Sequence, residues 1–122
     1  LHDIFPTLCD LMEIEKPESV TGLSFYKMFN DENYVSREGM YYAYANLHRC
    51  GRVGDYKIIE YRNYINKTQL FNITDDPYET DDLSEDEDHR EILQEMKKHF
   101  QRLAVSSGDR YDTRSQRYWD CF

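Results

Sequence analysis

The sequence predicts an α+β fold in which a small antiparallel sheet of three to four strands packs on a long C-terminal helix, preceded by two short helices. Three observations lead to this class: apolar residues at helical spacing near the N-terminus, short tyrosine- and isoleucine-rich runs separated by glycine turns, and one long apolar stripe near the C-terminus. A chain of 122 residues suits a modest core.

The first helix is expected after Asp3, whose side chain can cap it, with Pro6 in the first turn. Its apolar face is formed by Ile4, Leu8, Leu11 and Met12. Pro17 ends this helix, and the apolar cluster at 23–29 predicts a second short one.

The middle of the chain reads as a meander of strands. Residues 40–46 and 56–62 have strand character, and residues 51–53 lead into a turn in which Gly54 occupies the first central position of a type II′ hairpin. A further strand is expected at 68–73.

The long helix is the clearest prediction. Ser84 and Glu87 have the spacing of a capping box, and Gly108 is a natural stop. One apolar stripe follows the capping box and predicts packing on a face of the sheet: Ile92, Leu93, Met96, Phe100 and Leu103.

Composition excludes some functions. The 24 acidic and 15 basic side chains give a formal net charge of −9, which opposes binding to nucleic acid. The acidic run at 75–91 is typical of a solvated loop and helix start. The tail at 109–122 mixes arginines with aromatic residues, and packing of Trp119 onto a larger body is expected there rather than base stacking.

Three cysteines at wide spacing predict neither a disulfide framework nor a zinc site. The chain has no apolar run approaching about 18 residues and no signal-peptide pattern, so no membrane span is expected. The sequence leaves the compartment open, and an exported, periplasmic or lysosomal location of a longer protein that contains this chain is among the choices.

Five segments in order resemble motifs from the C-terminal part of the sulfatase family, and together they span roughly residues 2 to 105. They are Asp3–Leu8 (D-[IL]-x-P-T-L), 21–25 (D-G-x-S-L, with Thr21 for Asp and Phe25 for Leu), 52–59 (R-x-x-x-Y-K-[LYI]-I), 69–79 ([EQ]-L-[FY]-[DN]-L-x-x-D-P-x-E) and Leu83, which Asp82 precedes in place of Asn. None of these segments contains a nucleophile.

The resemblance implies the end piece of a larger α/β sulfatase of the alkaline phosphatase superfamily, a parent enzyme that hydrolyses sulfate esters. Such enzymes use a divalent cation (calcium) and a formylglycine made from C/S-x-P/A-x-R, which the sequence around Cys9 or Cys50 does not match. The chain also begins at Leu1 rather than Met. The expected partner is therefore a missing N-terminal catalytic domain, and this segment alone is predicted to be inactive and to hold no metal.

The resemblance also suggests sites and boundaries. The segment 46–50 joins two predicted strands, and His48 and Arg49 on it could approach a sulfated small molecule or glycan. Arg52 matches the family's arginine and is expected to be structural or to lie at the domain interface.

The expected division assigns residues 1–30 to the helical end of the catalytic-domain region, 31–108 to a C-terminal sheet-plus-helix subdomain and 109–122 to a tail. Two alternatives remain open. One is a phosphonate or phosphodiester hydrolase of the same superfamily, and the other is a free-standing acidic α+β module whose long helix or acidic run binds a basic partner.

Overall fold

The computed structural model describes residues 2–122. They form two compact units, residues 2–38 and 39–122, each described separately below. Among the described residues, no helix is both long and apolar enough to cross a membrane.

The first unit contains the two predicted short helices, α1 (Ile4–Leu11) and a 3₁₀ helix at Tyr26–Phe29. The predicted cap was wrong, because the Asp3 side chain accepts no hydrogen bond from the N-terminal turn of α1. It instead accepts from the backbone N–H of Leu23 (2.9 Å) and from the guanidinium of Arg37. Asp3 therefore holds the returning loop of this unit.

Thr7 makes the second tie within this unit. Its buried hydroxyl donates to the carbonyl of Asp3 at 2.7 Å and accepts from the N–H of Phe25 at 3.1 Å. The Asp and the Thr of the D-[IL]-x-P-T-L segment thus both bind the chain some twenty residues later. This explains why a scaffold needs those residue types at that spacing.

The apolar side chains of α1 remain largely exposed. The exposed fractions of Phe5, Leu11 and Met12 are 52%, 54% and 57%, whereas Pro6, Thr7 and Cys9 are buried. The apolar face predicted for this helix is therefore an uncovered surface within the described residues.

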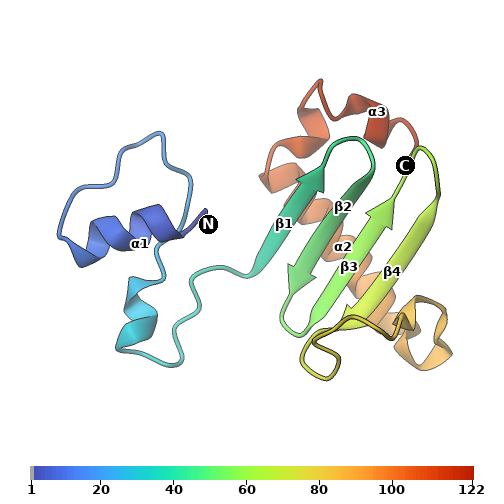
Figure 1. Cartoon of the computed structure of the whole chain (residues 1–122), viewed down its shortest axis with the longest axis horizontal. Coiled ribbons are helices and arrows are strands. Elements are labelled where there is room, and N and C mark those ends of the chain that lie inside the picture. Colours follow the sequence, from blue (N-terminus) through green and yellow to red (C-terminus); the bar gives the residue numbers. More distant parts are fainter. Residues whose placement is uncertain (1) are drawn as a thin grey trace. The chain divides into compact units, whose positions relative to one another are not determined.

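The second unit contains the predicted sheet (Figure 1). Its strands are β1 (Gly39–Tyr44), β2 (His48–Val53), β3 (Tyr56–Tyr61) and β4 (Lys67–Asn72), in the order β1-β2-β3-β4 with every pair antiparallel. The four-stranded meander confirms the predicted sheet.

Two turns set the register. Gly54 has φ +55° and Asp55 does not share that left-handed conformation, which fits the predicted type II′ turn. The segment 46–50 is not a loop, however, because β2 already begins at His48 and only residues 45–47 form the turn. Ala45 absorbs the sharp reversal with φ +47°.

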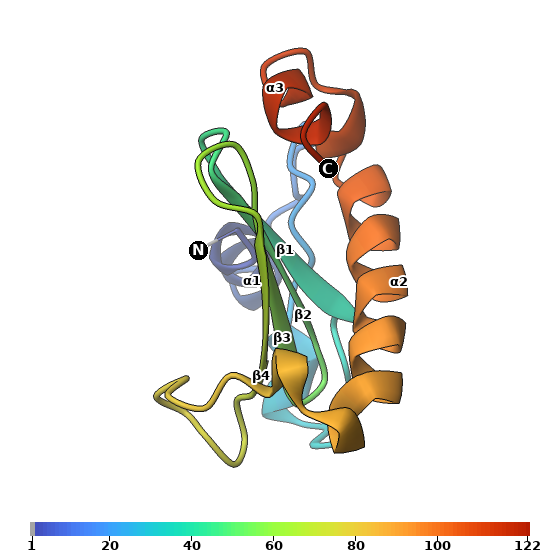
Figure 2. The ribbon, with the colours of Figure 1, turned by 90° about the vertical axis from the view of Figure 1, so that its right-hand side faces the viewer.

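The long helix α2 (Arg90–Ser106) covers one face of the sheet (Figure 2). The predicted capping box was wrong: two 3₁₀ turns precede α2, and the carboxylates of Asp82 and Asp86 accept from the N–H groups of Ser84 and Asp88. Gly108 has φ +78° and ends the helical segment as predicted.

The core lies between α2 and the sheet. It is formed by Ile58, Leu70, Met96, Phe100, Ala104, Tyr118 and Trp119. The last two come from the chain after α2, where a short helix α3 (Gln116–Trp119) folds back. Trp119 thus packs into this unit itself rather than onto a separate body.

Candidate functional site

The two faces of the sheet differ in their surroundings. Because successive side chains of a strand point to opposite faces, His48, Cys50 and Arg52 of β2 share one face, while Arg49, Gly51 and Val53 share the other. Gly51 brings β2 close to the helix, since a Cβ there would lie 3.5 Å from the Phe100 ring. The face of His48 is therefore the one that α2 leaves uncovered.

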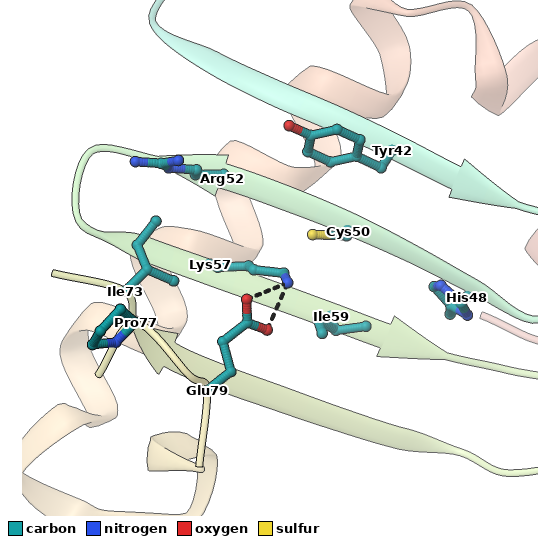
Figure 3. Close-up of a pocket in the computed structure, with 9 residues that line it drawn as sticks. All are labelled: Tyr42, His48, Cys50, Arg52, Lys57, Ile59, Ile73, Pro77 and Glu79. Carbon is teal, nitrogen blue, oxygen red and sulfur yellow. Dashed lines mark hydrogen bonds and ion pairs between the residues drawn. The ribbon is translucent and has the colours of Figure 1, made fainter. Parts of the chain in front are cut away.

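This uncovered face holds a hollow of about 510 Å³ (Figure 3). Its lining comes from β1, β2, β3 and the loop after β4: Tyr42, His48, Cys50, Arg52, Lys57, Ile59, Ile73, Pro77 and Glu79. The mixture of cations, imidazole, phenol and apolar groups makes it the best candidate site in the described part of the chain.

An ion pair between Lys57 and Glu79 crosses the hollow. Lys57 Nζ lies 2.7 and 2.6 Å from the two carboxylate oxygens (Figure 3). Glu79 is presented by the tight turn after Pro77, with φ +55°, and its N–H donates to the carbonyl of Asp76. The lysine of the Y-K motif and the glutamate of the D-P-x-E motif thus meet as an ion pair.

His48 lies in a row of rings on this face. Its imidazole centroid is 5.3 Å from the rings of both Tyr44 and Tyr61 on the neighbouring strands. Burial lowers the pKa of His48, and the charges of Arg49 and Lys57 lower it further. A neutral ring of this kind can both donate and accept a hydrogen bond at neutral pH.

Arg49 points to the opposite face and is only 1% exposed. Its Nε donates to Asp109 at 2.7 Å, and its guanidinium lies 4.3 Å from the centre of the Tyr118 ring. The structure therefore does not bring His48 and Arg49 together on one surface, because they are neighbours in a strand.

Arg52 lines the hollow and is exposed, and its guanidinium forms no ion pair or hydrogen bond with any described residue. Cys50 beside it is buried, and burial raises the pKa of its thiol to about 11. That thiol is a poor nucleophile at neutral pH.

Sequence reasoning missed Tyr42, Lys57 and Glu79 as members of this site. The motifs that contain Lys57 and Glu79 can be recognised in the sequence. Their side chains pair only because the fold brings together two segments that are more than twenty residues apart. Tyr42 has no motif, and only its place opposite Cys50 in the β1–β2 register puts it in the hollow.

No group of three or more His, Cys, Asp or Glu residues that could hold a metal ion occurs among residues 2–122. The described residues thus do not fit the divalent cation that the resemblance implies.

Known proteins match nearly the whole chain. The family model for the C-terminal region of N-sulphoglucosamine sulphohydrolase matches residues 2–106. An uncharacterized Haemophilus influenzae protein is 30% identical over 113 residues, which cover 84% of this chain and 57% of that protein.

Solved structures agree. A 2-O GAG sulfatase superposes with a TM-score of 0.73 and 26% identity, covering 89% of this chain and 25% of its own. A Bacteroides thetaiotaomicron VPI-5482 protein described as a sulfatase has the same TM-score and identity, with 93% and 28% covered.

A third structure is that of a protein in complex with its substrate D-glucosamine-2-N,6-O-disulfate. It superposes with a TM-score of 0.68 at 22% identity and covers 97% of this chain and 24% of its own. This likeness shows the shared fold. The chain thus spans 57% of the curated relative and about a quarter of each solved structure. On the match over residues 2–106, this chain belongs to the family of N-sulphoglucosamine sulphohydrolase C-terminal domains, the C-terminal α+β piece of sulfatases.

Proposed function

We propose that this chain is the C-terminal part of an enzyme that hydrolyses sulfate esters, and that the uncovered face of its sheet forms one wall of the substrate pocket. The family match over residues 2–106 carries the proposal. The two sulfatase structures at 26% identity support it over the phosphodiester and interaction-module alternatives.

The partner of this chain is a catalytic domain on the same polypeptide. It supplies the formylglycine and the calcium ion, for which the described residues offer no ligand cluster. The exposed apolar side chains of α1, with Phe5 and Leu11 more than half exposed, are the surface on which it packs. The proposed division keeps residues 1–30 with the catalytic region, 31–108 as the subdomain and 109–122 as its tail. The compact units of the structure divide between residues 38 and 39, and the tail packs into the core of the second unit.

The substrate is a sulfated small molecule or glycan, which His48 contacts from the hollow. The ring is half-buried, flanked by two tyrosines, and its nitrogens find no hydrogen-bond partner among the described residues. The Arg52 side chain also has no carboxylate partner among the described residues, and we assign it to a carboxylate of the catalytic domain. Arg49 serves the site indirectly, because its guanidinium contacts Asp109 and the carbonyl of Ala45 and does not line the hollow.

The test uses the complete reading frame that contains this chain. A protein that includes C/S-x-P/A-x-R upstream should release sulfate from a chromogenic aryl sulfate in the presence of calcium, whereas the 122-residue chain should release none. Turnover by the pure 122-residue chain, or its absence from the complete protein on every sulfate ester tried, contradicts the proposal.

The proposed contact between His48 and the substrate is tested in the complete protein with the variant His48→Ala. Loss of one hydrogen-bonding ring should raise KM about tenfold on a sulfated disaccharide, which corresponds to the ~1.4 kcal/mol of a typical hydrogen bond. His89→Ala, in the turn before α2, is the matched control and should leave KM unchanged. An unchanged KM in His48→Ala removes His48 from the pocket.

A further inference from the structure

One carboxylate joins the C-terminal segment to the sheet. Asp109 Oδ2 accepts from the Tyr41 hydroxyl at 2.8 Å, from Arg49 Nε at 2.7 Å and from the Trp119 indole N–H at 3.0 Å, while Oδ1 accepts from the Ser115 hydroxyl at 2.6 Å. Burial by itself would raise the pKa of Asp109, but the hydrogen bonds from Arg49, Ser115 and Tyr41 outweigh it and lower that pKa. The group therefore stays charged at neutral pH.

Arg49 carries this connection onward to the turn before β2. Its Nη1 donates to the carbonyl of Ala45 at 2.7 Å and to that of His48 at 3.1 Å. The other side of the guanidinium is held by the hydrogen bond to Asp109 and by the Tyr118 ring, whose centre is 4.3 Å away. Arg49 thus spans the distance between the C-terminal segment and the two ends of the turn.

The turn needs such support. Ala45 has φ +47°, a left-handed conformation that a residue with a Cβ adopts at a cost of about 1–3 kcal/mol. Backbone hydrogen bonds from Leu47 N–H to the Tyr44 carbonyl (3.2 Å) and from Arg62 N–H to the Leu47 carbonyl (2.9 Å) hold the rest of it. The residue that this turn delivers onto the uncovered face is His48.

We propose that Asp109, acting through Arg49, is a positioning residue for His48: the C-terminal segment holds the turn at 45–47 and so sets where the imidazole stands in the hollow. The role of His48 in this inference rests on the proposed function. Asp109 lies beyond residue 106, where the family match ends, so this device is not part of the matched region.

The first experiment does not depend on catalysis. In the 122-residue chain, Asp109→Asn should speed amide hydrogen exchange of Leu47 and Arg62 about tenfold, because their bonds close the turn. The Ile73 amide, bonded to the Asp55 carbonyl in the loop before β3, should change by less than about twofold. Equal acceleration at Leu47 and Ile73 would mean general loosening and would overturn the inference.

Matched variants define the effect. Asp112→Asn removes a half-buried carboxylate of the same segment, whose side chain is paired with Arg114 at 2.9 Å, and should leave all three amides as in the wild type. Asp109→Glu should restore part of the protection. If Asp109→Asn does not fold, Tyr41→Phe and Ser115→Ala, which each remove one bond to Asp109, should show the same site-selective acceleration at smaller size.

The second experiment is a double-mutant cycle in the complete enzyme. Asp109→Asn should raise KM for a sulfated disaccharide with kcat within about twofold of the wild type, and should have no further effect on KM when His48 is already Ala. Additive effects on KM would contradict positioning through His48. If the complete wild-type protein has no sulfatase activity, the proposed function is refuted, and the hydrogen-exchange experiment alone decides this inference.

Discussion

At the residue scale, Asp82 shows how the structure accommodates Asp where the sulfatase motif has Asn. It stands where the sulfatase motif has Asn, yet its carboxylate accepts from the N–H groups of Leu70 (3.1 Å) and Ser84 (3.2 Å), as an amide oxygen could. The charge adds an ion pair with Lys67 at 3.1 Å. Burial alone would raise the pKa of Asp82, but these hydrogen bonds lower it to about 2.

This shift has a consequence for stability. A carboxyl whose pKa is lower in the folded state contributes stability that is present above its unfolded pKa, here 3.8, and is lost as the pH falls to about 2. Asp82→Asn should therefore lower the free energy of unfolding by about 1–2 kcal/mol at pH 7 and by much less near pH 2. Urea denaturation at the two pH values measures the difference. An equal loss at both would show that the charge is irrelevant, and exposed Asp10→Asn is the control.

At the element scale, α2 is held to the sheet by aromatic contacts from both directions. The Phe100 ring, 1% exposed, lies 5.8 Å from Tyr41 of β1 and 6.1 Å from Trp119 of α3. The Phe100 side chain of α2 therefore contacts both the sheet and the C-terminal segment. The segment after Gly108 is thus a structural part of this unit.

Phe100→Ala should consequently destabilise the unit by about 3–5 kcal/mol, because it leaves a cavity that three elements line. Lys98→Ala, on the exposed side of the same helix, should change the free energy of unfolding by less than about 0.5 kcal/mol. Chemical denaturation followed by the fluorescence of Trp119 measures both. A loss below about 1 kcal/mol in Phe100→Ala would show that the junction collapses to fill the space.

At the scale of the whole molecule, the distribution of polar and apolar surface agrees with the proposed place of this chain within a larger enzyme. The net charge of −9 is carried largely by the loop and helix start at 75–91. Apolar side chains are instead uncovered on α1, and an unpaired Arg52 lines the hollow of the sheet-plus-helix unit, as judged within residues 2–122.

The 122-residue chain should therefore bind a hydrophobic fluorescent dye. The double variant Phe5→Ser and Leu11→Ser should lower the dye signal about twofold, since both side chains are more than half exposed. Tyr78→Ser, which alters a side chain that is 87% exposed in the acidic loop, serves as the comparison and should leave the signal as it was. A wild-type chain with no dye signal would argue against a docking surface on α1.

The sequence by itself determined the order of α1, the four strands and α2, the type II′ turn at Gly54 and membership of a sulfatase-like scaffold, because these depend on local periodicity, turn chemistry and motif spacing. It did not predict α3 in the segment after Gly108. Only the tertiary structure decided which polar groups meet. Asp3 and the Ser84–Glu87 pair have the spacing of caps, but Asp3 binds Leu23 and Arg37, and Asp82 and Asp86 cap the turns instead. His48 and Arg49 are adjacent in sequence and parted by strand alternation, whereas Lys57 and Glu79 are distant and joined. Long-range pairing decides such contacts, and local sequence does not encode it.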